Sequence, residues 1–123
     1  GSTYGGNPLA CAVAMEALQV LKDENMAENS AAMGELLRQE ITRLESSHVH
    51  LVRGKGLLNA VVIEHEDKEA AWQLCLRLKE HGLLAKPTHG DKIRFAPPLI
   101  INKEQVLECV AIISDSLGVL NEE

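Results

Sequence analysis

The sequence lacks an excess of positive charge and any long hydrophobic run. Its 123 residues include 12 lysines and arginines and 18 aspartates and glutamates, for a formal net charge of -6 at pH 7. This balance argues against nucleic acid or an anionic membrane as the main partner, because both favour basic surfaces. No apolar run reaches the roughly 18 residues needed to span a bilayer, and no signal-peptide pattern is present. We therefore expect a soluble domain that carries no targeting signal in these residues.

Cysteine is scarce, and recognisable catalytic sets are missing. Cys11, Cys75 and Cys109 form an odd set, and each falls in an apolar segment of helical periodicity. Free, buried thiols in a reducing compartment are expected, with disulfides as the less favoured alternative. His48 and His50 have no third ligand at a metal-binding spacing, so no metal site is predicted. No paired carboxylates, Ser-His-Asp set or Cys-His set stands out, and no self-sufficient catalytic constellation is expected.

The chain does have enough apolar residues for a core. Hydrophobic residues make up 46% of it, which is typical of a single compact domain. Asn7 is a favoured helix cap and Pro8 a favoured first helical residue, so a first helix is expected from Pro8 to about Glu24. Alanines dominate its first half, which favours a helix buried between domains or subunits. A second helix is expected from about Met26 to Glu45.

The rest of the chain alternates strands and helices. The expected order is strands at 48–53 and 57–64, a helix at 67–81, strands at 83–86 and 92–95 around a turn, and a last helix capped by Asn102. The connections between strands are of hairpin length. We therefore predict an α+β fold in which helices pack on a small, mainly antiparallel sheet of about three to four strands. The inward face of the third helix is expected to contain Ala71, Trp72, Cys75 and Leu78.

The opening GSTYGGNP stretch has the chemistry of an anion-binding loop. Its glycines can bring backbone N–H groups close to an anion, Ser2 and Thr3 carry hydroxyl donors, and a helix N-terminus follows. It is not a Walker motif, because no Gly-Lys-Ser/Thr sequence follows. An ordinary glycine-rich turn before a capped helix explains the same residues equally well.

Arg94 is the second candidate. Alternation along the strand at 92–95 puts Ile93 and Phe95 on one face and Lys92 and Arg94 on the other. A guanidinium group can hold a carboxylate by two parallel hydrogen bonds, and the proline pair that follows would keep this strand end rigid. A solvated or structurally paired arginine is nevertheless the more common role of such a residue.

The remaining candidates favour structural roles. Lys55 and Lys86 could bind a carbonyl group covalently, but the sequence shows no apolar pocket that would activate either amine. We interpret both as surface lysines. Asn59, inside an apolar strand, is expected to be a buried amide with its hydrogen bonds satisfied. Trp72 is expected in the core rather than against a cofactor.

Three stretches resemble one family when they are taken in order and with their spacing. STYGGNPLACAVAMEAL, VRGKGLLNAVVI and GLLAKPTHGDKIRFAPPLII are similar to the C-terminal part of the class III, fold type I, pyridoxal-phosphate aminotransferases. The last two look most like the ornithine aminotransferase group, whereas acetylornithine aminotransferases share the RF-x-PPL core and vary before it. The resemblance covers nearly the whole chain. It implies a cofactor-phosphate loop and interdomain or interface helix at 1–25, a C-terminal small domain at 26–123, and a longer parent protein.

The resemblance also implies roles for three residues. Thr3, with Ser2 beside it, would bind the phosphate of pyridoxal 5'-phosphate in the other subunit of a homodimer. Arg94 would bind a substrate carboxylate, pairing with a glutamate when ornithine is bound and releasing it for 2-oxoglutarate. That glutamate, the Schiff-base lysine and the other cofactor ligands would lie upstream of Gly1. This segment would therefore supply no catalytic residue.

The implied reaction is a ping-pong exchange between an amino acid and a 2-oxo acid. The δ-amino group of L-ornithine passes to 2-oxoglutarate, giving glutamate 5-semialdehyde and glutamate, in the cytoplasm or mitochondrial matrix. The segment alone should be inactive. Acetylornithine or another ω-aminotransferase is the alternative within the same reaction class. A non-catalytic α+β module for ligand binding or dimerisation is the alternative from another class, and the alanine-rich first helix weighs against it.

Overall fold

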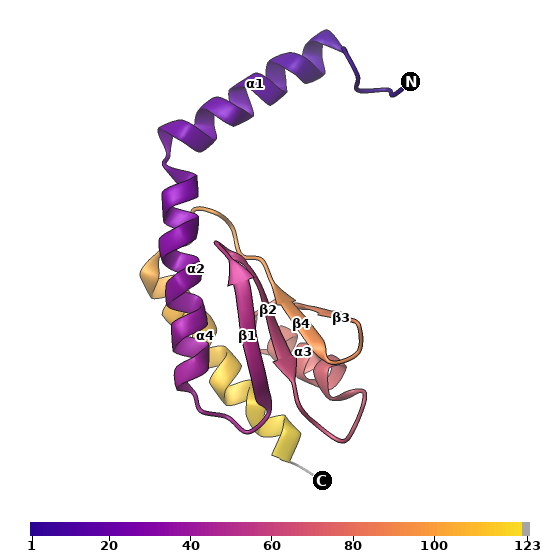
Figure 1. Cartoon of the computed structure of the whole chain (residues 1–123), viewed down its shortest axis with the longest axis vertical. Coiled ribbons are helices and arrows are strands. Elements are labelled where there is room, and N and C mark those ends of the chain that lie inside the picture. The colour runs from indigo at the N-terminus through magenta and orange to yellow at the C-terminus, as the bar shows by residue number, and fades with distance from the viewer. Residues whose placement is uncertain (122–123) are drawn as a thin grey trace.

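Two consecutive helices form an arm at the start of the chain. In the computed structural model, which describes residues 1–121, α1 (Pro8–Asp23) and α2 (Met26–Arg43) meet at a bend. Asn25 occupies this bend in a left-handed backbone conformation, with φ of 49°. Helix α2 lies along the sheet, whereas α1 extends away from it (Figure 1). The N-terminus therefore lies far from the sheet.

Helix α1 begins where the sequence predicts, but it contributes no buried side chain. Asn7 caps it by accepting hydrogen bonds from the N–H groups of Leu9 and Ala10, at 3.0 and 3.1 Å, and Pro8 is its first residue. Leu9 is 74% exposed and Met15 72%. None of the side chains of α1 is buried by the described residues. Apolar surface of this extent is typical of a contact with another domain or subunit, so burial of this helix between domains stays a prediction.

Four strands form one antiparallel sheet. These are β1 (Val49–Lys55), β2 (Leu58–Ile63), β3 (Lys86–Thr88) and β4 (Lys92–Phe95), in the order β1-β2-β4-β3. Helix α3 (Ala70–Glu80) links β2 to β3, and α4 (Lys103–Leu117) with the 3-10 turn η1 (Gly118–Asn121) follows β4. The predicted order of helices and strands and the α+β class are confirmed. Helix boundaries differ from the predicted ones by no more than a few residues, as expected of helix ends.

The core lies between one face of the sheet and the helices. Strict alternation in β2 and β4 buries every second side chain on this face. The helices supply the other half of the core, and the fully buried large side chains among the described residues include Ile41, Leu74, Leu78, Ile93 and Val106. On the opposite face, Leu51 and Leu58 are exposed, so the described residues leave that face of the sheet open.

The third strand of the chain differs from the prediction. It was expected at 83–86, but β3 runs from Lys86 to Thr88. The N–H of Leu83 donates to the carbonyl of Leu78 at 2.9 Å, so Leu83 still belongs to the C-terminal cap of α3. Pairing with β4 starts only at Lys86, which lies opposite Arg94. Sequence periodicity carries no information on such a pairing.

Two side chains expected inside are exposed. Trp72 is 48% exposed, because the buried face of α3 consists of Ala70, Ala71, Leu74, Cys75 and Leu78. Position 72 follows Ala70 by two residues, about 200° around the helix, and therefore points away from the core.

Cys11, which was also expected to be buried, is exposed on α1, whereas Cys75 is buried and Cys109 half-buried. All three are free thiols, as predicted. Burial raises the pKa of Cys75 to about 11, so this thiol is protonated and unreactive at neutral pH.

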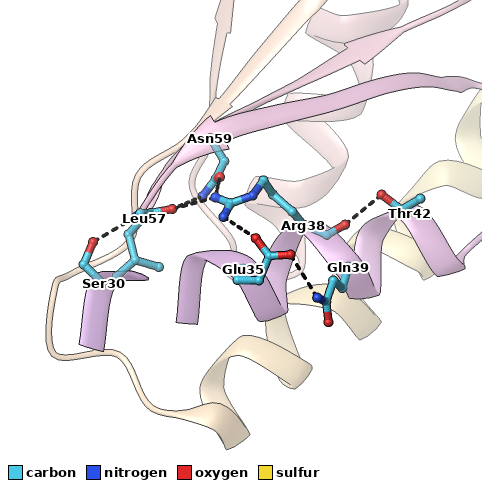
Figure 2. Close-up of polar contacts among 8 residues, drawn as sticks. Ser30, Glu35, Arg38, Gln39, Thr42, Leu57 and Asn59 are labelled. Atoms are coloured by element: carbon cyan, nitrogen blue, oxygen red, sulfur yellow. Dashed lines mark hydrogen bonds and ion pairs between the residues drawn. The ribbon is translucent and has the colours of Figure 1, made fainter. Parts of the chain in front are cut away.

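The turn between β1 and β2 is fixed against one face of α2 (Figure 2). Ser30 Oγ accepts a hydrogen bond from the N–H of Leu57 at 3.0 Å. One helical turn further on, the backbones touch at Gly34, where an added Cβ would lie 1.8 Å from the carbonyl oxygen of Gly56. Only glycine fits at position 34 without moving the turn.

Arg38 completes this contact. Its guanidinium donates to the carbonyl oxygen of Gly56 at 2.9 Å and to Asn59 Oδ1 at 2.8 Å, and it forms an ion pair with Glu35 at 2.8 Å (Figure 2). Asn59 Nδ2 also donates to Gly56, at 3.2 Å. Asn59 is 1% exposed, so the prediction of a buried, satisfied amide is confirmed. Hydrogen bonding to Arg38 also lowers the pKa of Glu35.

Removing the Ser30 hydroxyl should destabilise the protein. In Ser30→Ala, the N–H of the buried Leu57 loses its acceptor, and we expect the free energy of unfolding to fall by about 1–3 kcal/mol. Chemical denaturation of the full-length protein measures this change. The matched control is Ser47→Ala, because Ser47 is exposed and should change the free energy by less than about 0.5 kcal/mol. Equal losses in the two variants would show that the Ser30 contact contributes nothing.

Candidate functional site

The opening loop, residues 1–7, is exposed along its whole length. Ser2 Oγ accepts a hydrogen bond from the N–H of Gly5 at 2.9 Å, and the N–H of Asn7 donates to the carbonyl of Tyr4 at 3.3 Å. Gly6 has φ of 75°, a conformation that glycine adopts without strain. The glycines thus shape a compact, exposed turn that carries the Ser2 and Thr3 hydroxyl groups just before the start of α1.

Only some of the donors of this loop are available to a ligand. The first N–H groups of α1 are used, because Asn7 accepts from Leu9 and Ala10, and Pro8 has no N–H. Ser2 accepts its hydrogen bond, so its own proton remains to be donated. The Thr3 hydroxyl makes no hydrogen bond within residues 1–121. The donor set therefore fits a phosphate that the hydroxyl groups bind, with little contribution from the helix N-terminus.

Arg94 lies on the open face of the sheet. As predicted, Ile93 and Phe95 are buried on the other face and Arg94 is exposed. It is paired with Ala60 on β2 and with Lys86 on β3. Its guanidinium takes part in no ion pair or side-chain hydrogen bond within residues 1–121. The guanidinium is therefore free to donate hydrogen bonds to a carboxylate from outside the described residues.

The open face also carries basic residues that sequence reasoning assigned no function. Register aligns Arg53 of β1 with Ala60, so that Arg53, Ala60, Arg94 and Lys86 form one row across all four strands. We call this set the cation row. Alternation gives the face of each residue, but only the strand register places them in one line. A hairpin register deduced from the Gly-Lys-Gly turn could have aligned Arg53 with Ala60.

Lys55 and Lys86 agree with their expected role as surface residues. Lys55 and Lys86 are both exposed on the surface of the chain. Within residues 1–121, no group of three or more histidine, cysteine or acidic side chains is placed to hold a metal ion. His50 lies 3.1 Å from Glu64, and His81 lies 3.2 Å from the Ser116 hydroxyl.

The structure does not bring the two candidate sites together. The loop with Ser2 and Thr3 lies beyond the far end of α1, whereas Arg94 lies in the sheet (Figure 1). At about 1.5 Å per residue, the 16-residue helix α1 alone spans about 24 Å. One chain therefore presents the candidate anion-binding loop and the candidate carboxylate-binding arginine at separate places.

Comparison with known proteins assigns the family. The family model described as Aminotransferase class-III matches residues 1–117. The chain belongs to the class III aminotransferases. The resemblance of the three sequence stretches is thereby confirmed. Enzymes of this class use pyridoxal phosphate in general. In such enzymes the cofactor supplies the reactive group, and the protein binds and orients the cofactor and the substrate.

Among relatives of this class III chain, the mitochondrial ornithine aminotransferase of Drosophila melanogaster is 62% identical over 117 residues. The mitochondrial ornithine aminotransferase of Rattus norvegicus is 56% identical. Each alignment covers 95% of this chain and 27% of the relative. The chain thus spans about a quarter of the length of these proteins.

A solved structure gives the same fold. The crystal structure of acetylornithine aminotransferase from Elizabethkingia anophelis superposes with a TM-score of 0.90 and 56% identity, covering 97% of this chain and 32% of that one. None of the helices within residues 1–121 is long and apolar enough to cross a membrane.

Proposed function

We propose that this chain is the C-terminal part of a pyridoxal-phosphate-dependent ornithine aminotransferase. The full protein transfers the δ-amino group of L-ornithine to 2-oxoglutarate and releases glutamate 5-semialdehyde and glutamate. The observation that carries the proposal is the 62% identity to an ornithine aminotransferase across 95% of the chain. The free guanidinium of Arg94 on the open face of the sheet adds a group suited to a substrate carboxylate.

In the proposed enzyme, this chain binds the cofactor phosphate and orients the 2-oxo acid. Pyridoxal phosphate, when bound, would supply the chemistry of amino-group transfer for both half-reactions. Ser2 and Thr3 would hold the cofactor by donating hydrogen bonds from their hydroxyl groups to its phosphate. Arg94 holds a carboxylate of the 2-oxo acid by two parallel N–H···O bonds and so fixes the distance and angle of the carbonyl group. No residue of this chain is assigned a proton-transfer step, and the cofactor-binding lysine belongs to the rest of the protein.

The separation of the two sites supports a shared active site. Because α1 carries the loop away from the sheet, Thr3 serves the cofactor of the second subunit of a homodimer, while Arg94 serves a site in its own subunit. The exposed apolar side chains of α1 pack against the upstream part of the protein and the second subunit. Residues 1–25 then form the cofactor-phosphate loop and interface helix, and 26–123 the small domain.

Acetylornithine is the second candidate for the amino donor. The observation that favours it is the 56% identity to the Elizabethkingia anophelis acetylornithine aminotransferase. A non-catalytic ligand-binding or dimerisation module is the third candidate, and the uncovered apolar surface of α1 weighs against it. We place the protein in the mitochondrial matrix or the cytoplasm, a proposal that the mitochondrial names of the insect and rat relatives support.

Donor specificity tests these candidates. The full-length protein with pyridoxal phosphate and 2-oxoglutarate is assayed with L-ornithine and, separately, with N-acetylornithine, and glutamate formation is measured. We expect a higher kcat/KM with L-ornithine and detection of glutamate 5-semialdehyde. A higher value with N-acetylornithine would establish the second candidate. No transfer from either donor would favour the non-catalytic module.

The isolated chain should not bind the cofactor at one lysine. Lys55 and Lys86 are both exposed, so neither amine is shielded from water in a way that would activate it. We expect pyridoxal phosphate followed by borohydride to give only weak, scattered labelling of residues 1–123, measured by peptide mass spectrometry. The full-length protein is the control and should be labelled at a single lysine outside this chain. Stoichiometric labelling at Lys55 or Lys86 would contradict the proposed division of roles.

A further inference from the structure

The cation row has a fixed geometry. Each member of the row is the cross-strand partner of the next. From β1 through β2 and β4 to β3, the order is Arg53, Ala60, Arg94 and Lys86. Neighbouring strands lie about 4.8 Å apart, so the backbones at Arg53 and Arg94 are separated by roughly 10 Å. Ala60, the small residue between them, leaves room above the sheet. The row therefore presents basic groups on both sides of Arg94.

No acidic group neutralises this row within the described residues. The four strands contain no aspartate or glutamate. Lys92, the other basic residue of β4 on this face, forms an ion pair with Asp91 in the adjoining turn. Arg53, Arg94 and Lys86 take part in no ion pair within residues 1–121. Among the described residues, the row thus carries three positive charges without an ion-pair partner, although the whole chain carries a net charge of -6.

The pair Lys86 and Arg94 is unfavourable for the sheet alone. Like charges directly opposite each other on adjacent strands repel and destabilise the pairing. Lys86 is also held in place, because Pro87 restricts the residue before it to an extended backbone. Proline suits this position because β3 lies at the edge of the sheet, where a missing N–H leaves few hydrogen bonds unmade. An anion bound at Arg94 would remove the repulsion.

We propose that Lys86 and Arg53 are positioning residues that select the dianionic 2-oxo acid at Arg94 by its charge. The inference rests on the proposed function. At neutral pH, 2-oxoglutarate carries two negative charges, whereas ornithine carries two ammonium groups and one carboxylate. The positive potential of the row attracts 2-oxoglutarate and repels ornithine. Exposed charges interact over several ångströms when the salt concentration is low. The row therefore distinguishes the substrates of the two half-reactions.

Neutral substitutions test this role in the full-length protein. In Lys86→Gln and in Arg53→Gln, we expect the KM for 2-oxoglutarate to rise about 3–10-fold with kcat within about twofold, as for loss of one exposed charge. The KM for ornithine should stay constant or fall. Lys86→Arg keeps the positive charge and should show the same KM values as the unsubstituted protein. The control is Lys79→Gln, which removes the same charge from an exposed position on α3 and should change neither KM.

Binding provides a second readout. Glutarate, a dicarboxylate without the reacting carbonyl group, is titrated into the full-length protein by calorimetry. Its Kd should rise about 3–10-fold in Lys86→Gln and Arg53→Gln, and raising the salt from about 50 to about 300 mM should weaken binding to the original protein more than to these variants.

The possible outcomes separate this inference from the proposed function. If both variants match Lys79→Gln while Arg94→Lys lowers kcat/KM, the row does not select by charge and the proposed function stands. If the KM for ornithine rises as much as that for 2-oxoglutarate, the row acts through the general geometry of the site, and charge selection is wrong. If the original protein transfers no amino group to 2-oxoglutarate, the proposed function itself fails.

Discussion

An Arg94→Lys substitution in the full-length protein is expected to lower kcat/KM for 2-oxoglutarate by about 10–200-fold, which corresponds to about 1.5–3 kcal/mol. Lysine keeps the positive charge of Arg94 but cannot form two parallel hydrogen bonds with one carboxylate. A loss of this size therefore measures the geometry of the guanidinium group. Steady-state kinetics with varied 2-oxoglutarate and saturating amino donor gives the value.

The structure predicts that this variant stays folded. Arg94 is exposed and has no ion pair within residues 1–121, so the melting temperature should change little. Arg77→Lys is the matched control, because Arg77 is an exposed arginine on α3 that pairs only with Glu80 within those residues. It should change neither the kinetics nor the melting temperature. A sharp fall in the melting temperature of Arg94→Lys with intact kinetics would make Arg94 a structural ion-pair residue.

A Thr3→Val substitution is expected to weaken the affinity for pyridoxal phosphate by about 10–150-fold. Valine preserves the shape of threonine and removes only the hydroxyl donor, so a phosphate oxygen loses a charge-assisted hydrogen bond of about 1.5–3 kcal/mol. The fold of the cofactor-free protein should stay intact, because the Thr3 hydroxyl supports no other contact within residues 1–121. Titration of the cofactor-free enzyme measures the affinity. Thr3→Ser, which keeps the donor, is the control and should bind nearly as well as the original protein.

A mixed dimer tests whether Thr3 acts across the interface. One subunit carries Thr3→Val, and the other lacks its cofactor-binding lysine. If Thr3 serves the neighbouring site, the single lysine-competent site receives its threonine from the lysine-deficient subunit and binds the cofactor normally. If that site instead shows the weakened affinity, Thr3 acts within its own subunit. The interface role of the opening loop would then be wrong.

Local features of the fold were predictable because they depend on near neighbours in the sequence. The Asn7 cap, the alternation around Arg94 and the burial of Asn59 follow from helix capping and from the two-residue period of a strand. The exposure of Trp72 was missed because an error of one position in a helix shifts a side chain by about 100°. The start of β3 was missed because it depends on where α3 ends and where β4 pairs.

The candidate site was less accessible to sequence reasoning. The residues Ser2, Thr3 and Arg94 were selected by residue type, and their roles came from a family resemblance. The cation row requires the register of three strand pairs, of which only the β1–β2 register could have been deduced from its short turn. The contact of Arg38 with Asn59 joins residues 21 positions apart and depends on how α2 lies on the hairpin. Such features become visible only once the elements are placed in space.

The absence of acidic residues from the four strands has a consequence for how this sheet can evolve. A glutamate beside Arg94 would stabilise the sheet by an ion pair, so selection for stability alone would favour one. Being tethered, however, that carboxylate would compete with any free dicarboxylate at an effective concentration in the millimolar range or above. The arginine would then be held by its own sheet in both half-reactions. Keeping the sheet free of acids leaves Arg94 to partners that can be released, namely the upstream glutamate that the family resemblance implies and the substrate carboxylate.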